Sequence, residues 1–273
     1  MMKKANYLLA GLLLLCMINC TGSTAQDDNQ VYIAVTTAHW SQDLENFSMD
    51  EWKAVEKEYF DKVTSKNEYI MSTDVATHLF TADNSEIKFA TAYKTWGDIP
   101  KAAKRNQELA KEAWPDSLAR RAFFKKQAAY YSDFHSDEIY VPMDGRKISE
   151  TESIEPQVLY VRSSKFAYPD DGSMKEFSSM MKELNDVTIQ KNEFIISYSP
   201  VAHAYGADRR DFVEVFRVAS MSDIEKSMER EDELRKERWP DEDERKAFFK
   251  KLGKYFTGFH ADYMYQTVPE LSK

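Results

Sequence analysis

The stretch that decides the fold is WPDSLARRAFFKKQAAYYSDFHSDEIY, from Trp114 to Tyr140, because the chain carries it twice. The second copy is WPDEDERKAFFKKLGKYFTGFHADYMY, from Trp239 to Tyr265, and it stands 125 positions later without a gap. A period of this length far exceeds the roughly 20–50 residues of solenoid units. The sequence therefore predicts a duplicated domain rather than a repeat array.

The apolar patterns around each copy predict the order strand, helix, two strands, two helices and strand. Trp114-Pro115 divides the helical region, because the residue before a proline is pushed out of the α region. The last helix is expected to continue to about Phe134, with His135 at its end, and Glu138 to Met143 to form the last strand. This is the ferredoxin-like order, an α+β fold class in which helices cover one face of an antiparallel sheet.

Residues 1–25 have the features of a secretory signal, with Lys3-Lys4 ahead of a short apolar run. The run is too short for a transmembrane helix, which needs about 20 apolar residues. Two processing routes stay open: cleavage after Ala25, or lipidation of Cys20 as in a lipoprotein. We expect an exported protein, either periplasmic or secreted, or anchored in the outer membrane as a lipoprotein.

The repeat also sets the remaining boundaries. Residues 31–143 and 157–268 are expected to form the two halves, and the polar segment 144–156, with Gly145 and Pro156, the linker. Both cysteines lie in residues 1–25, so the mature halves have no disulfide and no thiol chemistry.

The composition limits the partners. The net charge of the chain is −9, and it becomes about −11 once the two lysines of the signal are removed. Such a surface repels nucleic acid and anionic lipid headgroups. The sequence contains no GxGxxG, Walker or GxSxG motif, which sets aside nucleotide-dependent and α/β-hydrolase chemistry. We expect a small apolar or aromatic ligand and a monomer that forms a pseudo-dimer within one chain.

The repeated histidines are the most informative polar residues. His78 and His203 are equivalent and are expected on the second strand of each half, while His135 and His260 are expected at the last helix ends. An acid and a tyrosine follow the latter pair at fixed spacing. The candidate ligand-binding residues are His78, His135, Asp137, Tyr140, His203, His260, Asp262 and Tyr265.

Two interpretations of these residues stay open. Imidazole and carboxylate together suit a metal or haem site or a general base. Alternatively, His135 stabilises a helix C-terminus, Asp137 holds its ring, and His78 is a structural strand residue. The spacing matches no zinc pattern of the HExxH or CxxC kind, so no metal site is predicted and the cofactor is left unknown.

The segment DFVEVFRV, Asp211 to Val218, with the Ser222-Asp223-Ile224 helix entry, resembles the dimeric α+β barrel superfamily, which includes antibiotic-biosynthesis-monooxygenase-like and stress-responsive barrel domains. The WPD…AFFKK…FHxDxxY pattern resembles a set of exported Bacteroidetes proteins. The resemblance implies that the two halves pack sheet to sheet as an intramolecular dimeric barrel, with a cavity between sheet and helices. In haem-degrading members an Asn, Trp and His constellation acts; the matching residue types here are Asn67, Asn192, Trp114 and Trp239, with the repeated histidines.

Fold alone does not imply function. The main hypothesis is an exported, non-catalytic protein that binds a small ligand or an interaction partner. The alternatives are a cofactor-independent monooxygenase or haem-handling enzyme of the barrel type, and a structural envelope protein without a ligand. If the histidines form sites, the duplication predicts two of them per chain.

Overall fold

The computed structural model describes residues 30–149 and 153–273. The first half contains, in chain order, β1 (Tyr32–Trp40), α1 (Met49–Lys62), the 3-10 turn η1 (Thr64–Lys66), β2 (Ser72–Phe80), β3 (Glu86–Tyr93), α2 (Asp98–Ala113), α3 (Ser117–Ala128) and β4 (Tyr131–Pro142). The second half contains β5 (Val158–Phe166), α4 (Met174–Val187), β6 (Ser197–Tyr205), β7 (Asp211–Val218), α5 (Met221–Arg238), α6 (Glu242–Gly253), β8 (Phe256–Thr267) and the 3-10 turn η2 (Pro269–Leu271). The predicted signal in residues 1–25 lies outside the described residues.

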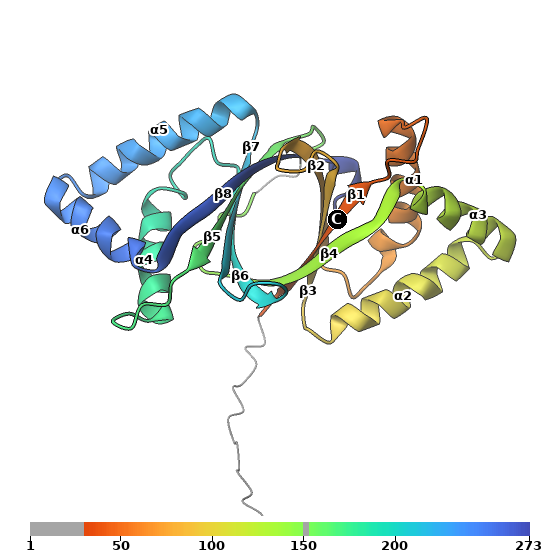
Figure 1. Ribbon diagram of the computed structural model, residues 1–273, viewed down its shortest axis with the longest axis horizontal. Coiled ribbons are helices and arrows are strands. Elements are labelled where there is room, and N and C mark those ends of the chain that lie inside the picture. Colours follow the sequence, from red (N-terminus) through yellow and green to blue (C-terminus); the bar gives the residue numbers. More distant parts are fainter. Residues whose placement is uncertain (1–29, 150–152) are drawn as a thin grey trace, which may run out of the picture.

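The strands of the described residues form one closed barrel in the order β1-β3-β2-β8-β5-β7-β6-β4. Helices α1, α2 and α3 cover one side of the barrel and α4, α5 and α6 the opposite side (Figure 1). The prediction of two tandem ferredoxin-like halves that form an intramolecular dimeric α+β barrel is confirmed. The sheets meet through their edges, β2 with β8 and β4 with β6, and closure leaves no free edge strand among the strands described.

The end of each helical region differs from the prediction. Helix α3 ends at Ala128 and β4 begins at Tyr131, so His135 lies in a strand; His260 likewise lies in β8. The prediction that these histidines lie at helix ends was wrong. The early residues of β4 are in a strand because they pair with β1, which lies opposite Tyr131 to Tyr140, whereas β6 pairs only with the last residues, Ile139 to Pro142.

Each half has an apolar core between its helices and its sheet. In the first half the core is built around Trp52 and Ile87, both fully buried. The segment after β8 adds Val268 and Leu271 to this core, so the end of the second half completes the first. Burial of such side chains typically contributes about 1.5–3 kcal/mol each.

A pair of lysines repeats this exchange between the halves. Lys273 Nζ, from the segment after β8, donates to the Asn67 carbonyl oxygen at 2.7 Å. Lys147 Nζ, from the segment after β4, donates to the Asn192 carbonyl oxygen at 2.7 Å. Each half is thus held by the segment that follows the last strand of the other half.

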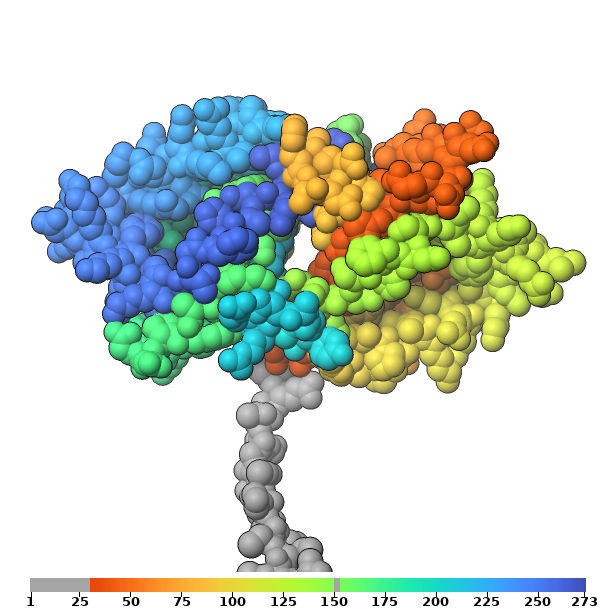
Figure 2. Space-filling view, in the orientation of Figure 1, coloured from red at the N-terminus to blue at the C-terminus, as the bar shows by residue number. Residues whose placement is uncertain are grey.

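The space-filling view shows the end of the barrel hollowed between β8 and β4 (Figure 2). Among the helices of residues 30–149 and 153–273, none is both long and apolar enough to cross a membrane.

Candidate functional site

Two cavities of similar size lie between the sheet and the helices, one in each half. Chamber 1, in the first half, has a volume of about 400 Å³, and chamber 2, in the second half, about 410 Å³. The residues that line chamber 1 include Thr36, Glu56, Tyr59, Phe89, Tyr131 and His135. Those that define chamber 2 are Arg162, Met181, Glu214, Glu231, Arg235 and Phe256.

The duplication makes the walls of the two chambers comparable position by position. Outside the first strand the offset is 125; between β1 and β5 it is 126, because Trp40 lies opposite Tyr131 and Phe166 lies opposite Phe256. Polar residues of chamber 1 face apolar equivalents: Glu56, Gln127 and Tyr131 correspond to Met181, Leu252 and Phe256. The charged residues of chamber 2, Arg162, Glu214, Glu231 and Arg235, instead correspond to uncharged residues of the first half, Thr36, Phe89, Asn106 and Ala110.

Chamber 1 contains a buried carboxylate with neutral donors. Glu56 is 7% exposed and accepts hydrogen bonds from the Tyr131 hydroxyl at 2.7 Å and from Gln127 Nε2 at 3.0 Å. Tyr131 in turn accepts from Trp52 Nε1 at 2.8 Å. Burial raises the pKa of Glu56, although the two hydrogen bonds oppose the rise. Burial and the charge of Glu56 raise the pKa of Tyr59 to about 12, so this phenol stays neutral.

Chamber 2 instead contains two carboxylates and two guanidinium groups among apolar side chains. Glu214 Oε1 accepts from the Tyr198 hydroxyl at 2.7 Å, and Glu231 is ion-paired to Arg235 at 2.5 Å. Burial raises the pKa of both carboxyls, and the charges of Arg162 and Arg235 oppose the rise. The two negative and two positive side chains balance in number, and burial of the carboxyl groups reduces the screening of their interactions with a charged ligand.

One donor in chamber 2 has no acceptor. Arg235 Nε is buried and makes no hydrogen bond within the described residues, although its Nη2 atom binds Glu231. An unpaired buried donor costs about 1–3 kcal/mol, and such groups are uncommon away from functional sites.

The repeated His-x-Asp pair contacts, in each half, a residue that lines the chamber of that half. In the first half His135 Nε2 is 3.5 Å from Asp137 Oδ2, and Asp137 accepts from Thr36 at 2.5 Å; both His135 and Thr36 line chamber 1. Both members of the histidine–aspartate pair are more than half exposed.

In the second half the same pair contacts the charged wall. His260 Nε2 is 3.4 Å from Asp262 Oδ2, while Asp262 Oδ1 accepts from Arg162 Nε at 2.9 Å and from the Tyr160 hydroxyl at 2.8 Å. Burial acts to raise the pKa of Asp262, but the hydrogen bonds from Arg162 and Tyr160 outweigh it and lower the pKa. Asp262 therefore stays ionised and holds Arg162 at the chamber.

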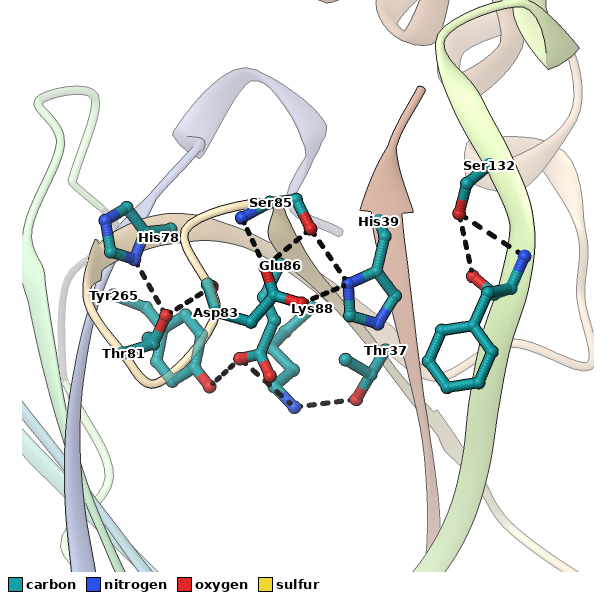
Figure 3. A network of polar contacts seen from close by, with 11 residues as sticks. Thr37, His39, His78, Thr81, Asp83, Ser85, Glu86, Lys88, Ser132 and Tyr265 are labelled. Carbon is teal, nitrogen blue, oxygen red and sulfur yellow. Dashed lines mark hydrogen bonds and ion pairs between the residues drawn. The ribbon is translucent and has the colours of Figure 1, made fainter. Parts of the chain in front are cut away.

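The other repeated residues lie at the two junctions between the halves. In the strand pairing His78 lies opposite Tyr265, and Tyr140 lies opposite His203. Around the first junction a polar network runs from Lys88 and Glu86 to the Tyr265 hydroxyl, which donates to Glu86 at 2.8 Å (Figure 3).

The two junctions are not identical. At the first junction His78 Nδ1 forms a hydrogen bond with Thr81 Oγ1 at 2.7 Å. At the second junction Gly206 replaces Thr81, and His203 Nε2 is buried without a hydrogen-bond partner among the described residues. Glycine is favoured at position 206, because its φ of +145° is a backbone conformation that residues with a Cβ rarely adopt.

The structure does not unite the histidines of one half into one site. His135 lines chamber 1 and His78 does not, and β1 and β3 separate the strands that carry them. Within the described residues no group of three or more His, Cys, Asp or Glu side chains is placed to hold a metal ion.

The Asn and Trp residues of the haem-degrading pattern serve the packing. Asn67 is fully buried, and its Nδ2 donates to the Ala102 carbonyl at 2.9 Å. Trp114 stacks on Phe123 with ring centroids 4.1 Å apart. Neither residue lines a chamber, and neither do Asn192 and Trp239.

Sequence reasoning missed the charged and polar chamber residues because it searched for repeated ones. The available signal was the opposite: in DFVEVFRV the outward-facing positions are Phe212, Glu214, Phe216 and Val218, so one acid interrupts an apolar face. Comparison with Phe89 in the first half would have marked Glu214 as a functional candidate.

Comparisons with known proteins agree on the fold. A "putative monooxygenase" of Fusobacterium nucleatum superposes with a TM-score of 0.56 at 10% identity, covering 87% of this chain and 92% of that one. A second "putative monooxygenase", from Lactobacillus acidophilus, gives 0.53 at 7% identity over 88% and 93%. A chlorite dismutase variant of Candidatus Nitrospira defluvii gives 0.50 at 11% identity over 88% and 92%. The chain has the dimeric α+β barrel fold.

No protein-family model matches the sequence, and no curated protein matches it either. The structural neighbours are named as enzymes, monooxygenases and a chlorite dismutase. This finding contradicts the main hypothesis of a non-catalytic binding or interaction protein and favours the enzymatic alternative.

Proposed function

We propose that the protein is a cofactor-independent monooxygenase and that chamber 2 is its active site. The observation that carries the proposal is the set of four charged side chains, Glu214, Glu231, Arg162 and Arg235, in a cavity otherwise walled largely by apolar groups. The monooxygenase names of the structural neighbours support the reaction class. The substrate is a small aromatic compound with a C–H bond acidified by a neighbouring carbonyl group.

Glu214 is the general base in this proposal. Its Oε1 atom binds only the neutral Tyr198 hydroxyl, whereas Glu231 is held in an ion pair with Arg235 and is the weaker base. Burial raises the pKa of Glu214 above the ordinary value of 4.5, which brings it closer to the value that suits a base near neutral pH.

Arg162 and Arg235 stabilise the anion that forms when the substrate loses its proton. Asp262 fixes the first guanidinium and Glu231 the second, so both charges are in place before the reaction. The electron-rich anion then reduces O2 directly. One oxygen atom becomes the carbonyl oxygen of the product, and the other leaves as water with both hydrogens of the substrate methylene group. The methylene carbon is oxidised to a carbonyl carbon and O2 is the oxidant, so the step needs no further electron donor.

Haem chemistry fits these residues poorly. Haem iron is held by His, Cys, Met or Tyr. Among the described residues no histidine lines chamber 2, and the one that lines chamber 1, His135, is more than half exposed and paired to Asp137. The methionines of chamber 2 are Met181, which packs in the apolar core, and Met228, which is half-exposed. Burial raises the pKa of the tyrosines that line the chambers, which disfavours the phenolate that would bind iron: Tyr160, Tyr59, Tyr93 and Tyr131. We therefore propose a reaction that does not use haem.

Oxygen consumption with anthrone as probe tests the proposal, because its methylene group is acidified by a ketone. The purified chain is expected to consume one O2 per anthrone, form anthraquinone, and keep its activity with a chelator and without flavin. Glu214→Gln should lower turnover by about 10²-fold or more, the usual contribution of a general base. Glu229→Gln, which changes an exposed carboxylate on the nearby helix α5, is the control. Oxidation no faster than the uncatalysed rate, or full activity in Glu214→Gln, would contradict the proposal.

A further inference from the structure

The side chains that line chamber 1 are more aromatic and include fewer cationic groups than those that line chamber 2. Of the described residues that line it, none is a lysine or an arginine, and five are phenylalanine or tyrosine: Tyr59, Phe60, Phe89, Tyr93 and Tyr131. Chamber 2 has three such rings and two guanidinium groups. The first chamber therefore disfavours an anionic ligand and has a wall rich in aromatic side chains.

The carboxylate of this chamber has no cationic partner. Within the described residues Glu56 makes no ion pair, and its hydrogen bonds come from the neutral groups of Tyr131 and Gln127. The other acid that lines the chamber, Asp74, is already paired with Arg217 at 2.8 Å. A buried carboxylate without a counter-charge is costly, so a bound cation would stabilise its ionised form.

We propose that chamber 1 is a second ligand site, which takes a small organic cation such as an amine or a quaternary ammonium compound. The aromatic walls hold the alkylated cation through cation–π contacts, the established way in which proteins recognise quaternary ammonium groups. Glu56 supplies the negative charge on the α1 side. The volume of about 400 Å³ lies in the range of small-molecule sites.

The rim of the chamber is compatible with this ligand. His135 and Thr36 are held by Asp137, whose carboxylate adds negative charge near the entrance. Leu271, from the segment after β8, forms part of the wall, so the site depends on both halves of the chain. This inference is independent of the reaction proposed for chamber 2.

Calorimetric titration with a matched pair of probes tests the proposal: choline, and 3,3-dimethylbutan-1-ol, which has the same shape without the charge. The intact chain is expected to bind choline at least tenfold more tightly than the alcohol. Glu56→Gln should abolish this preference. Asp61→Asn removes an exposed carboxylate of the same helix and should keep it.

Because Glu56 also holds Tyr131, a second variant leaves that carboxylate in place. Tyr59→Leu removes one ring and should weaken choline binding about three- to tenfold, the range expected for one cation–π contact. The folded state of each variant is checked by its thermal unfolding. Equal binding of choline and the alcohol, absence of choline binding in the millimolar range, or choline binding that Glu56→Gln leaves intact would each overturn the proposal.

Discussion

Chambers 1 and 2 come from the same repeated sequence and occupy the same place in their halves, yet the polar groups that distinguish them lie on different elements. In chamber 1 the hydrogen-bonded group Glu56, Gln127 and Tyr131 comes from α1, α3 and the start of β4. In chamber 2 they come from β5, β7 and α5, carry charge, and leave one guanidinium nitrogen without an acceptor among the described residues. Duplication preserved the cavity and changed its chemistry.

The largest effect is expected from the charged wall of chamber 2. Arg235→Gln combined with Glu231→Gln keeps the net charge but removes a positive group from the developing anion. Turnover of anthrone is expected to fall by about 10²–10³-fold, the size seen when a preorganised stabilising donor is lost. Arg238→Gln, which removes an exposed arginine at the end of the same helix, is the matched control. Similar rates in both variants would remove the active-site assignment of Arg235.

A smaller difference is expected when one tyrosine hydroxyl group is removed from each chamber and the free energy of unfolding is measured. Tyr131→Phe leaves buried Glu56 short of a donor and Trp52 Nε1 without an acceptor, and is expected to cost about 1–3 kcal/mol of the free energy of unfolding. Tyr160→Phe in chamber 2 removes a hydroxyl whose partners Arg162 and Asp262 are over one-third exposed and can bind water, so less than about 1 kcal/mol is expected. Denaturant unfolding measures both free energies of unfolding. An equal loss of stability in the two variants would contradict the expected difference between the chambers.

The pH dependence of Glu214 gives a further test of chamber 2. Burial raises the pKa of Glu214 in the folded state above 4.5, so the folded protein binds its proton more tightly than the unfolded chain. Its contribution to stability is therefore complete below about 4.5 and is lost as the pH rises through the folded-state pKa. Glu214→Gln should become more stable relative to the wild type over that window, and wild-type activity should rise with pH through the same pKa. A stability difference independent of pH would contradict the raised pKa.

The smallest effect should be the same in both halves. Lys273→Met removes a hydrogen bond to the Asn67 carbonyl, and Lys147→Met removes the matching bond to the Asn192 carbonyl together with a longer one, at 3.3 Å, to the Ile189 carbonyl. The bond to asparagine is expected to contribute about 0.5–1.5 kcal/mol in each half. Thermal unfolding of the two variants should show similar shifts. A large difference between them would mean that the halves differ in their supporting contacts as well as in their chambers.

The repeat and its element order were sufficient to predict the fold, because apolar periodicity and capping residues act locally in each copy. The strand positions of His135 and His260 could not be predicted in the same way. Aromatic residues at Tyr130 and Phe134 are spaced as in a helix, and it is pairing with β1, with His135 opposite Ala38, that makes this segment a strand. That pairing depends on residues almost a hundred positions earlier in the chain.

The candidate site was harder to predict for a related reason. The histidines were chosen as candidates because they occur in both copies. In the structure two of them pair with aspartates beside the chambers, and two lie at the junctions between the halves. The chamber walls are formed by residues distant in sequence, such as Glu56 with Tyr131, and their significance lies in how the copies differ. A single pattern read along the chain cannot show which non-repeated residues share a cavity.

The most direct test of the central claim is a crystal structure of the protein with choline and alizarin, a phenolic anthraquinone that resembles an oxidised product and readily forms an anion. We expect alizarin in chamber 2, with an oxygen atom at Arg162 or Arg235, and choline in chamber 1 against Glu56. Both ligands in one chamber, the reverse arrangement, or the same ligand in both chambers would contradict the claim that the two cavities have different chemistry.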